Sequence, residues 1–156
     1  MSEEIKERLS KAEYDKVGEM LLELIAECPH VPQSVKNVPH GMGILIDSTG
    51  TGLGIFILTD GGRVKKRNVI GGFEAVINMQ IAYQSKADTN LKRINAQETV
   101  NKITGWLGDL GNLPKLTGNR TITKFEASGS YASRDSTTQD GYVAFAADVV
   151  MEYEVD

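Results

Sequence analysis

Two stretches of this sequence alternate between apolar and polar residues for much longer than an ordinary strand does. Apolar side chains occupy every second position in residues 73–84 and again in residues 142–155. A period of two places successive side chains on opposite faces of a sheet. Strands usually have about 5–6 residues, so we expect two unusually long strands, each with one apolar face. The apolar positions are Phe73, Ala75, Ile77, Met79, Ile81 and Tyr83 in the first strand, and Val143, Phe145, Ala147, Val149, Met151, Tyr153 and Val155 in the second.

A leading helix is predicted to begin after Ser10. Ser10 and Glu13 have the spacing of a capping box, in which each residue satisfies a free backbone group of the other. Apolar residues then recur every three or four positions, and Pro29 ends the helix. These apolar residues are Tyr14, Val17, Leu21, Leu24 and Cys28.

A second helix is predicted between the two long strands. Asn95 and Glu98 have the spacing of an N-cap and its partner, although the helix could begin a turn earlier at Thr89, with Leu91 and Ile94 extending the stripe. Gly111 supplies a stop signal. We expect the apolar stripe of this helix to cover the apolar face of the long strands. The stripe comprises Ala96, Val100, Ile103, Leu107 and Leu110, with Trp106 beside it.

The remaining segments predict an α+β fold. We interpret residues 29–40 as an extended, proline-rich connector, and residues 41–48 and 52–60 as the two strands of a hairpin. Turn residues at 60–62 are followed by a short predicted strand. Residues 119–133 form a further predicted strand, and a polar loop at 134–141 follows it. The chain is therefore expected to be one domain, residues 1–156. It combines a mostly antiparallel sheet of long strands with one central packed helix and a leading N-terminal helix.

Three glycines at alternate positions, Gly50, Gly52 and Gly54, raise the question of a phosphate-binding loop. A dinucleotide loop requires Gly-x-Gly-x-x-Gly followed by a helix, and a Walker loop requires Gly-Lys-Ser/Thr. Here the spacing differs, and the apolar run 55–58 that follows is typical of a strand. The glycines are better explained as turn and bulge positions, so we predict that the chain does not bind nucleotides.

Composition narrows the remaining function classes. The net charge of −4 and the pI of 5.3 argue against sequence-independent nucleic-acid binding, which needs a basic surface. No stretch has the roughly 20 apolar residues of a membrane span. Residues 1–16 lack the apolar core of a signal peptide, so we expect the chain to be made in a cytoplasm.

No constellation of catalytic or metal-binding residues emerges from the sequence. Cys28, His30 and His40 are the soft or borderline ligands, but a structural zinc site needs four ligands in paired spacing. No Gly-x-Ser-x-Gly elbow is present, and no pair of carboxylates stands out. We therefore expect a protein that is not an enzyme and that has no catalytic residues, no cofactor and no metal site.

Charged loops are the predicted interaction surfaces. Lys65, Lys66 and Arg67 form a basic run, and Arg134 and Asp135 lie in the polar loop at 134–141. Loops at strand ends commonly carry function, so we expect all five residues to contact partners, even though a short basic run is more often only a solvated strand. Both faces of the long strands carry apolar residues. We expect the helices of the chain to cover only part of this apolar surface, and a neighbouring subunit to cover the rest.

The order of these features resembles the tail terminator proteins of tailed bacteriophages and phage-derived tail particles, also called tail-to-head joining or minor capsid-like proteins. The resemblance covers nearly the whole chain, including the leading helix and residues 41–60. The resemblance lies in the order of the predicted elements and in the types of residue within them, and not in a single motif. The similar features are Gly72-Phe73, a strand ending at Tyr83, a helix ending in Trp106-Leu107, Leu113-Pro114-x-Leu116, Ile122-Thr123-x-Phe125, and a closing strand from Val149 to Tyr153.

The resemblance implies a structural virion protein without an active site. Such proteins form a homo-oligomeric ring, usually a hexamer, on the last ring of the tail tube. The ring stops tube polymerisation and presents its other face to the head or neck connector, while DNA only passes through the lumen. The resemblance also implies location in the tail or neck of a virion assembled in the bacterial host cytoplasm.

Two other interpretations stay open at this point. The chain could be a different tail or neck component, such as a tube protein or a head–tail stopper. It could also be a small α+β enzyme or ligand-binding domain that uses the connector at 28–40 as its site. A tube protein would form long filaments, a terminator would stop at a closed ring, and an enzyme would have a concave polar pocket.

Overall fold

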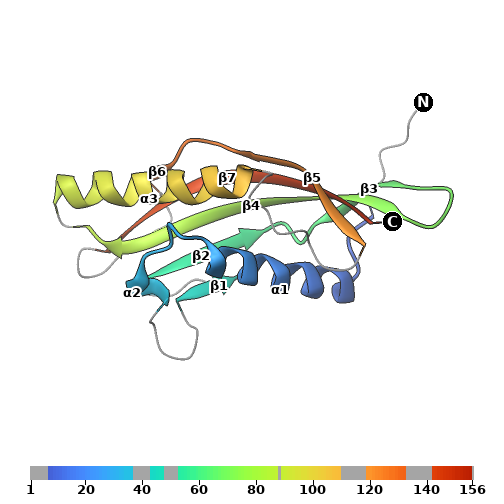
Figure 1. Cartoon of the computed structure of the whole chain (residues 1–156), viewed down its shortest axis with the longest axis horizontal. Helices are drawn as coiled ribbons and strands as arrows, with labels where there is room; N and C mark the ends of the chain where they lie inside the picture. Colours follow the sequence, from blue (N-terminus) through green and yellow to red (C-terminus); the bar gives the residue numbers. More distant parts are fainter. Residues whose placement is uncertain are drawn as a thin grey trace.

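The computed structural model describes residues 7–36, 43–47, 53–87, 89–109, 119–132 and 142–155. These residues form a seven-stranded sheet with helices packed on it (Figure 1). The helices are α1 (Lys11–Glu27), α2 (Gln33–Lys36) and α3 (Asn90–Gly108). The strands are β1 (Ile44–Ile46), β2 (Gly54–Thr59), β3 (Arg63–Arg67), β4 (Phe73–Lys86), β5 (Arg120–Ala127), β6 (Tyr131–Ala132) and β7 (Tyr142–Val155). The predicted α+β class is confirmed.

The two long strands form the centre of the sheet. β4 and β7 each have 14 residues and pair antiparallel along their whole length, from Phe73 opposite Val155 to Lys86 opposite Tyr142. At the usual rise per residue this pair is about 45 Å long. The period of two in the sequence therefore predicted both strands correctly.

Shorter strands line both edges of this central pair. β2 and β3 lie end to end along β4, whereas β5 and β6 lie along β7. The predicted turn at 60–62 bends the chain between β2 and β3 without reversing it, since both strands are antiparallel to β4. Gly61 and Gly62 supply the positive φ angles of this bend, 83° and 76°.

The predicted hairpin of residues 41–48 and 52–60 is wrong, because β1 pairs with β2 in parallel. Asp47, directly after β1, has a φ of 53°, and its carboxylate accepts hydrogen bonds from the Thr59 backbone N–H at 2.9 Å and hydroxyl at 3.1 Å. These bonds hold the end of β1 beside the end of β2. The Tyr14 hydroxyl donates to the same carboxylate. Partial burial, and then the contact with Asp47, raise the pKa of Tyr14 to about 12.

Helix α1 begins as the sequence predicted. The Ser10 hydroxyl accepts a hydrogen bond from the Glu13 backbone N–H at 3.2 Å, and the last helical residue is Glu27, two positions before Pro29. The predicted extended connector is partly wrong, because residues 33–36 form the short helix α2. The backbone N–H groups of Val35 and Lys36 both donate to the Pro32 carbonyl, consistent with proline at the start of a helical turn.

Helix α3 has the earlier of the two predicted starts, with Thr89 rather than Asn95 as its N-cap. However, Leu91 and Ile94 do not extend the buried stripe, because their exposed fractions are 68% and 52%. At about 100° per residue, Ile94 lies roughly 160° around the helix from Ala96. The predicted stop at Gly111 and the stripe residue Leu110 lie outside the described residues.

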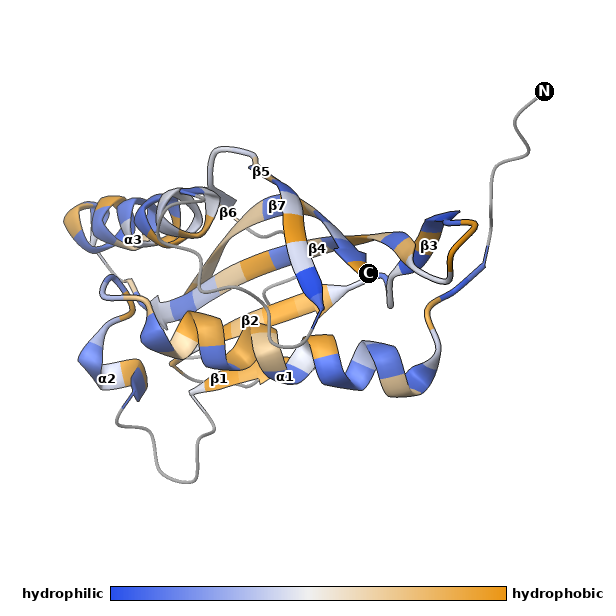
Figure 2. Cartoon of the chain, turned by 45° about the vertical axis from the view of Figure 1, so that its right-hand side comes forward, coloured by the Kyte–Doolittle hydropathy of each residue, from blue (hydrophilic) through white to orange (hydrophobic). Residues whose placement is uncertain are grey.

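Both long helices contribute to one core on one face of the sheet. The odd-numbered residues of β4 and β7 point into this core together with residues of α1 and α3. Figure 2 shows the apolar side of α1 turned toward β1 and β2. The predicted contact between the stripe of α3 and the long strands is confirmed by Ala96, Val100, Ile103 and Leu107, all nearly inaccessible to solvent. In the described part of the chain, no helix is both long and apolar enough to cross a lipid bilayer.

Candidate interaction surface on the open face of the sheet

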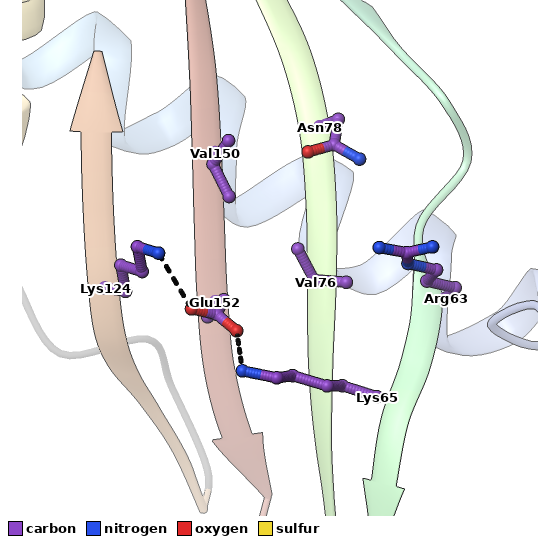
Figure 3. A pocket seen from close by; sticks show the side chains of 7 residues that line it. All are labelled: Arg63, Lys65, Val76, Asn78, Lys124, Val150 and Glu152. Carbon is purple, nitrogen blue, oxygen red and sulfur yellow. Dashed lines mark hydrogen bonds and ion pairs between the residues drawn. The ribbon is translucent and has the colours of Figure 1, made fainter. Parts of the chain in front are cut away.

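The even-numbered residues of β4 and β7 point to the opposite side of the sheet, which we call the open face. Toward the C-terminal end of β7 this face has a hollow of about 360 Å³. Figure 3 shows its side chains in front of four neighbouring strands, with α1 behind the sheet. The hollow is lined by Arg63, Lys65, Val76, Asn78, Lys124, Val150 and Glu152. We call it the open-face hollow.

Strand register brings these residues together from distant parts of the sequence. Glu152 of β7 lies opposite Val76 of β4 on one side and Lys124 of β5 on the other. Arg63 of β3 lies opposite Val76 in turn. The register of β3 shifts between Val64 and Lys66, so Lys65 lies in an irregularity that lets its side chain cross β4 to Glu152.

The charges in the open-face hollow are predominantly positive. Glu152 is its single carboxylate, and it is paired with Lys65 and, at 3.7 Å, with Lys124. The Lys65 hydrogen bond is the largest cause that lowers the pKa of Glu152. The Glu152 side chain is only 14% exposed, whereas those of Lys65 and Lys124 are 55% and 42% exposed. The carboxylate is therefore enclosed within the chain, and the cations face solvent.

This arrangement predicts an acid-dependent contribution of Glu152 to stability. A carboxyl group with a lower pKa in the folded chain stabilises it fully above the ordinary value of 4.5. That stability is lost as the pH falls through the lower folded value. We expect Glu152→Gln to lower the urea midpoint at pH 7, and to lower it progressively less as the pH falls below 4.5. The exposed Glu98→Gln is the control, and equal pH dependence of the two variants would show that the ion pairs do not matter.

The structure separates the three predicted basic residues. Lys65 lies in the open-face hollow. Arg67 instead forms an ion pair with Glu7, with its Nε 2.8 Å from a carboxylate oxygen, and its guanidinium lies 5.9 Å from the centre of the Phe73 ring. Lys66 is exposed and pairs in register with Glu74. Arg134 and Asp135 lie outside the described residues.

Of the residues that line the open-face hollow, the sequence analysis predicted only Lys65 as a site residue. It missed three charged residues: Arg63, Lys124 and Glu152. Each occupies a position on a predicted strand where a solvated charge is ordinary. These residues are brought together by the pairing of β3, β4, β7 and β5. The pairing places residues up to 89 positions apart in one hollow, as with Arg63 and Glu152. A single sequence does not encode this register in any local pattern.

The soft ligands considered from the sequence do not form a site among the described residues. Cys28 is fully buried, and burial raises the pKa of its thiol. His30 is exposed, and His40 lies outside the described residues. Within the described ranges, no group of three or more His, Cys, Asp and Glu side chains is arranged to hold a metal ion.

Comparisons with known proteins give similarity to solved structures alone. No family model matches the sequence, and no curated protein matches it. Among solved structures, the chain is similar to a chain of the virion of a native gene transfer agent particle, with a TM-score of 0.47 and 13% identity. The match covers 86% of this chain and 93% of the other. Similarity at this level does not assign a function to this chain.

Proposed function

We propose that the chain is a structural virion protein that forms a closed ring at the end of a phage-type tail tube. The ring stops tube polymerisation and joins the tube to the head or neck connector. The observation that carries this proposal is the placement of both long helices on one face of the sheet. Both long helices pack on the core face of the 14-residue strands, while the open face keeps apolar and basic side chains together.

The open face has the composition of a surface that packs against protein. Leu58 and Tyr131 are each 37% exposed there, and Val150 is half-buried beside the cations of the open-face hollow. Aromatic residues and arginine are enriched in protein–protein interfaces, and the open face has Tyr131 and Arg63. Among the described strands, β5 ends the sheet with an unpaired edge of eight residues. Such edges favour association unless another chain covers them.

Ring closure satisfies these surfaces without open-ended growth. A heterologous contact repeated around a closed rotation covers every equivalent patch, whereas the same contact without closure gives a filament. The six-fold ring, the tail tube partner and the head connector partner come from the sequence resemblance described above. In this proposal DNA crosses the lumen without a dedicated site, which suits a chain of net charge −4.

The basic run offers a test of the partner surface. Lys65→Glu, Lys66→Glu and Arg67→Glu together are expected to leave the chain folded, because all three residues are exposed. They should lower the urea midpoint, because Lys65→Glu removes an ion pair of Glu152 and Arg67→Glu removes that of Glu7. They should slow docking to an acidic partner at least tenfold, since charges at the rim of an interface act mainly on association. Lys102→Glu, exposed on α3, is the matched control. Tail assembly at the unchanged rate in the triple variant would remove these residues from the interface.

Mass photometry of the purified protein over a range of concentrations tests the proposed assembly. A terminator should give one discrete oligomer whose mass stops increasing at high concentration. A series of masses that grows without limit would instead identify a tube subunit. A monomer that binds a small ligand beside the connector at 28–40 would favour the ligand-binding alternative, because hollows of about 300–1,000 Å³ accommodate small molecules.

A further inference from the structure

The turn between β3 and β4 exposes two large apolar side chains side by side. Val69 and Ile70 have exposed fractions of 104% and 97%, the highest of the large apolar residues in the described chain. We call these two residues the hairpin tip. Figure 1 shows this turn at one end of the long axis of the molecule. A single exposed apolar residue is ordinary, but an adjacent pair on a projecting turn needs a reason.

The hairpin tip is held in a defined conformation. The Asn68 backbone N–H donates to the Gly72 carbonyl at 2.9 Å, and Gly71 has a φ of 104°, which favours glycine. A side chain at Gly72 would meet the Val155 carbonyl oxygen, which lies 2.2 Å from the position of a Cβ atom there. The turn is therefore built against the end of β7, so that docking would cost little conformational entropy.

The same chain carries an apolar hollow near its other end. This α1–α2 hollow has a volume of about 440 Å³ and lies between the C-terminal part of α1, α2 and the start of β1. Its lining comprises Leu22, Glu23, Ala26, Val35, Lys36, Gly43 and Ile44. Leu22 and Ile44 are only partly buried, so part of this apolar surface remains open to a ligand side chain.

Charge complementarity indicates which molecule the hairpin tip meets. The strand that leads to the tip carries Lys66 on its surface, beside the paired Lys65 and Arg67. The outer side of α1 beside the hollow carries the exposed Glu19, Glu23 and Glu27, against one basic residue in the lining, Lys36 of α2. A basic stem would thus approach an acidic rim while two aliphatic side chains enter an apolar hollow.

We infer that the hairpin tip of one copy of this chain docks into the α1–α2 hollow of a second copy. The tip and the hollow lie toward opposite ends of the molecule (Figure 1), so one chain cannot join its own two surfaces. The contact is heterologous, and each copy can both offer a tip and receive one. It supplies the subunit contact of the proposed ring, and its closure into a ring rests on that proposed function.

Cysteine cross-linking between two variants tests this contact directly. Ile70→Cys places a thiol on the hairpin tip, and Ala26→Cys places one on the exposed surface of α1 in the hollow. The native Cys28 is fully buried, so the unmodified chain is the background control. After mild oxidation, a mixture of the two variants should give a disulfide-linked dimer at least tenfold more abundant than either variant alone gives.

A second pair of variants measures the contribution of the tip to assembly. Val69→Ser with Ile70→Ser should weaken self-association at least tenfold and leave the thermal midpoint unchanged, because both side chains are already solvated. Leu91→Ser, another exposed apolar residue at 68% exposure, is the matched control and should assemble normally. A cross-link formed by Ile70→Cys alone would show a tip-to-tip contact and overturn the proposal.

The outcomes separate this contact from the proposed function. Closed rings that form without the mixed cross-link would overturn the contact and leave the terminator role intact. Open filaments that carry the cross-link would confirm the contact and contradict the terminator role. The proposed contact would also be overturned if the chain stayed monomeric at every concentration and gave no cross-link.

Discussion

Ile103→Ala and Leu107→Ala are each expected to lower the free energy of unfolding by about 2–5 kcal/mol, the usual loss for truncating a buried aliphatic side chain. Both residues are 1% exposed and belong to the core between α3 and the long strands. Urea denaturation of the purified variants measures the loss. Because the described residues form a single core cluster under both long helices, the variants should also unfold in one transition.

Leu91→Ala on the same helix is the matched control. Leu91 is 68% exposed, so its truncation should change the free energy of unfolding by less than about 0.5 kcal/mol, as surface substitutions do. Equal losses for Leu91→Ala and Ile103→Ala would mean that α3 buries a different face. A loss below about 0.5 kcal/mol for Ile103→Ala would contradict the packing of α3 on β4 and β7.

Arg120→Met is expected to be the most destabilising substitution of a charged residue, at about 3 kcal/mol. Arg120 Nε lies 3.0 Å from both carboxylate oxygens of Glu13, and the two side chains are only 10% and 11% exposed. Removing one partner of a buried pair leaves the other charge uncompensated, which costs about 3–5 kcal/mol. The lower end applies here because both side chains retain some contact with water.

The double variant Glu13→Leu with Arg120→Met distinguishes an unpaired charge from lost packing. Replacing both partners of a buried ion pair by apolar residues is often neutral, so the double variant should recover most of the stability that Arg120→Met loses. Guanidinium denaturation at pH 7 compares the variants. If the single and double variants lose the same free energy, the Glu13 carboxylate is not the reason for the loss.

The parts of the fold that follow from local periodicity were predictable from the sequence. The predicted strands 73–84 and 142–155 nearly match β4 and β7, because alternation over so many residues is typical of a strand alone. The Ser10 cap of α1 and the Thr89 start of α3 are also local signals. Leu91 and Ile94 were misplaced because apolar character was followed along the chain without checking the helical phase.

Features that depend on long-range pairing were not predictable in the same way. The parallel pairing of β1 with β2 depends on Asp47, whose partner Thr59 lies 12 positions away, and a hairpin is the simpler expectation for two strands so close in sequence. The open-face hollow likewise depends on the register that places Lys65 and Lys124 on either side of Glu152. Neither arrangement has a sequence pattern of its own.

The two proposed interaction surfaces have different roles in this account. The hairpin tip and the α1–α2 hollow lie toward opposite ends of one chain and would join neighbouring copies. The open-face hollow lies on the sheet, with α1 on the other side (Figure 3). Its exposed cations, Lys65 and Lys124, are suited to an acidic partner, whereas Leu58 and Tyr131 are the part of the open face that a neighbouring subunit would cover. Variants at the two surfaces should therefore affect subunit association and docking to other components separately.

Electron microscopy of tails that carry this protein tests the central claim most directly. We predict one closed ring of this chain at the end of the tail tube that faces the head, and no copies along the tube. Labelling the chain at the exposed Lys102 of α3 would mark its position without altering either proposed surface. Label distributed along the length of the tube, or open filaments of this chain, would contradict the claim and identify a tube subunit.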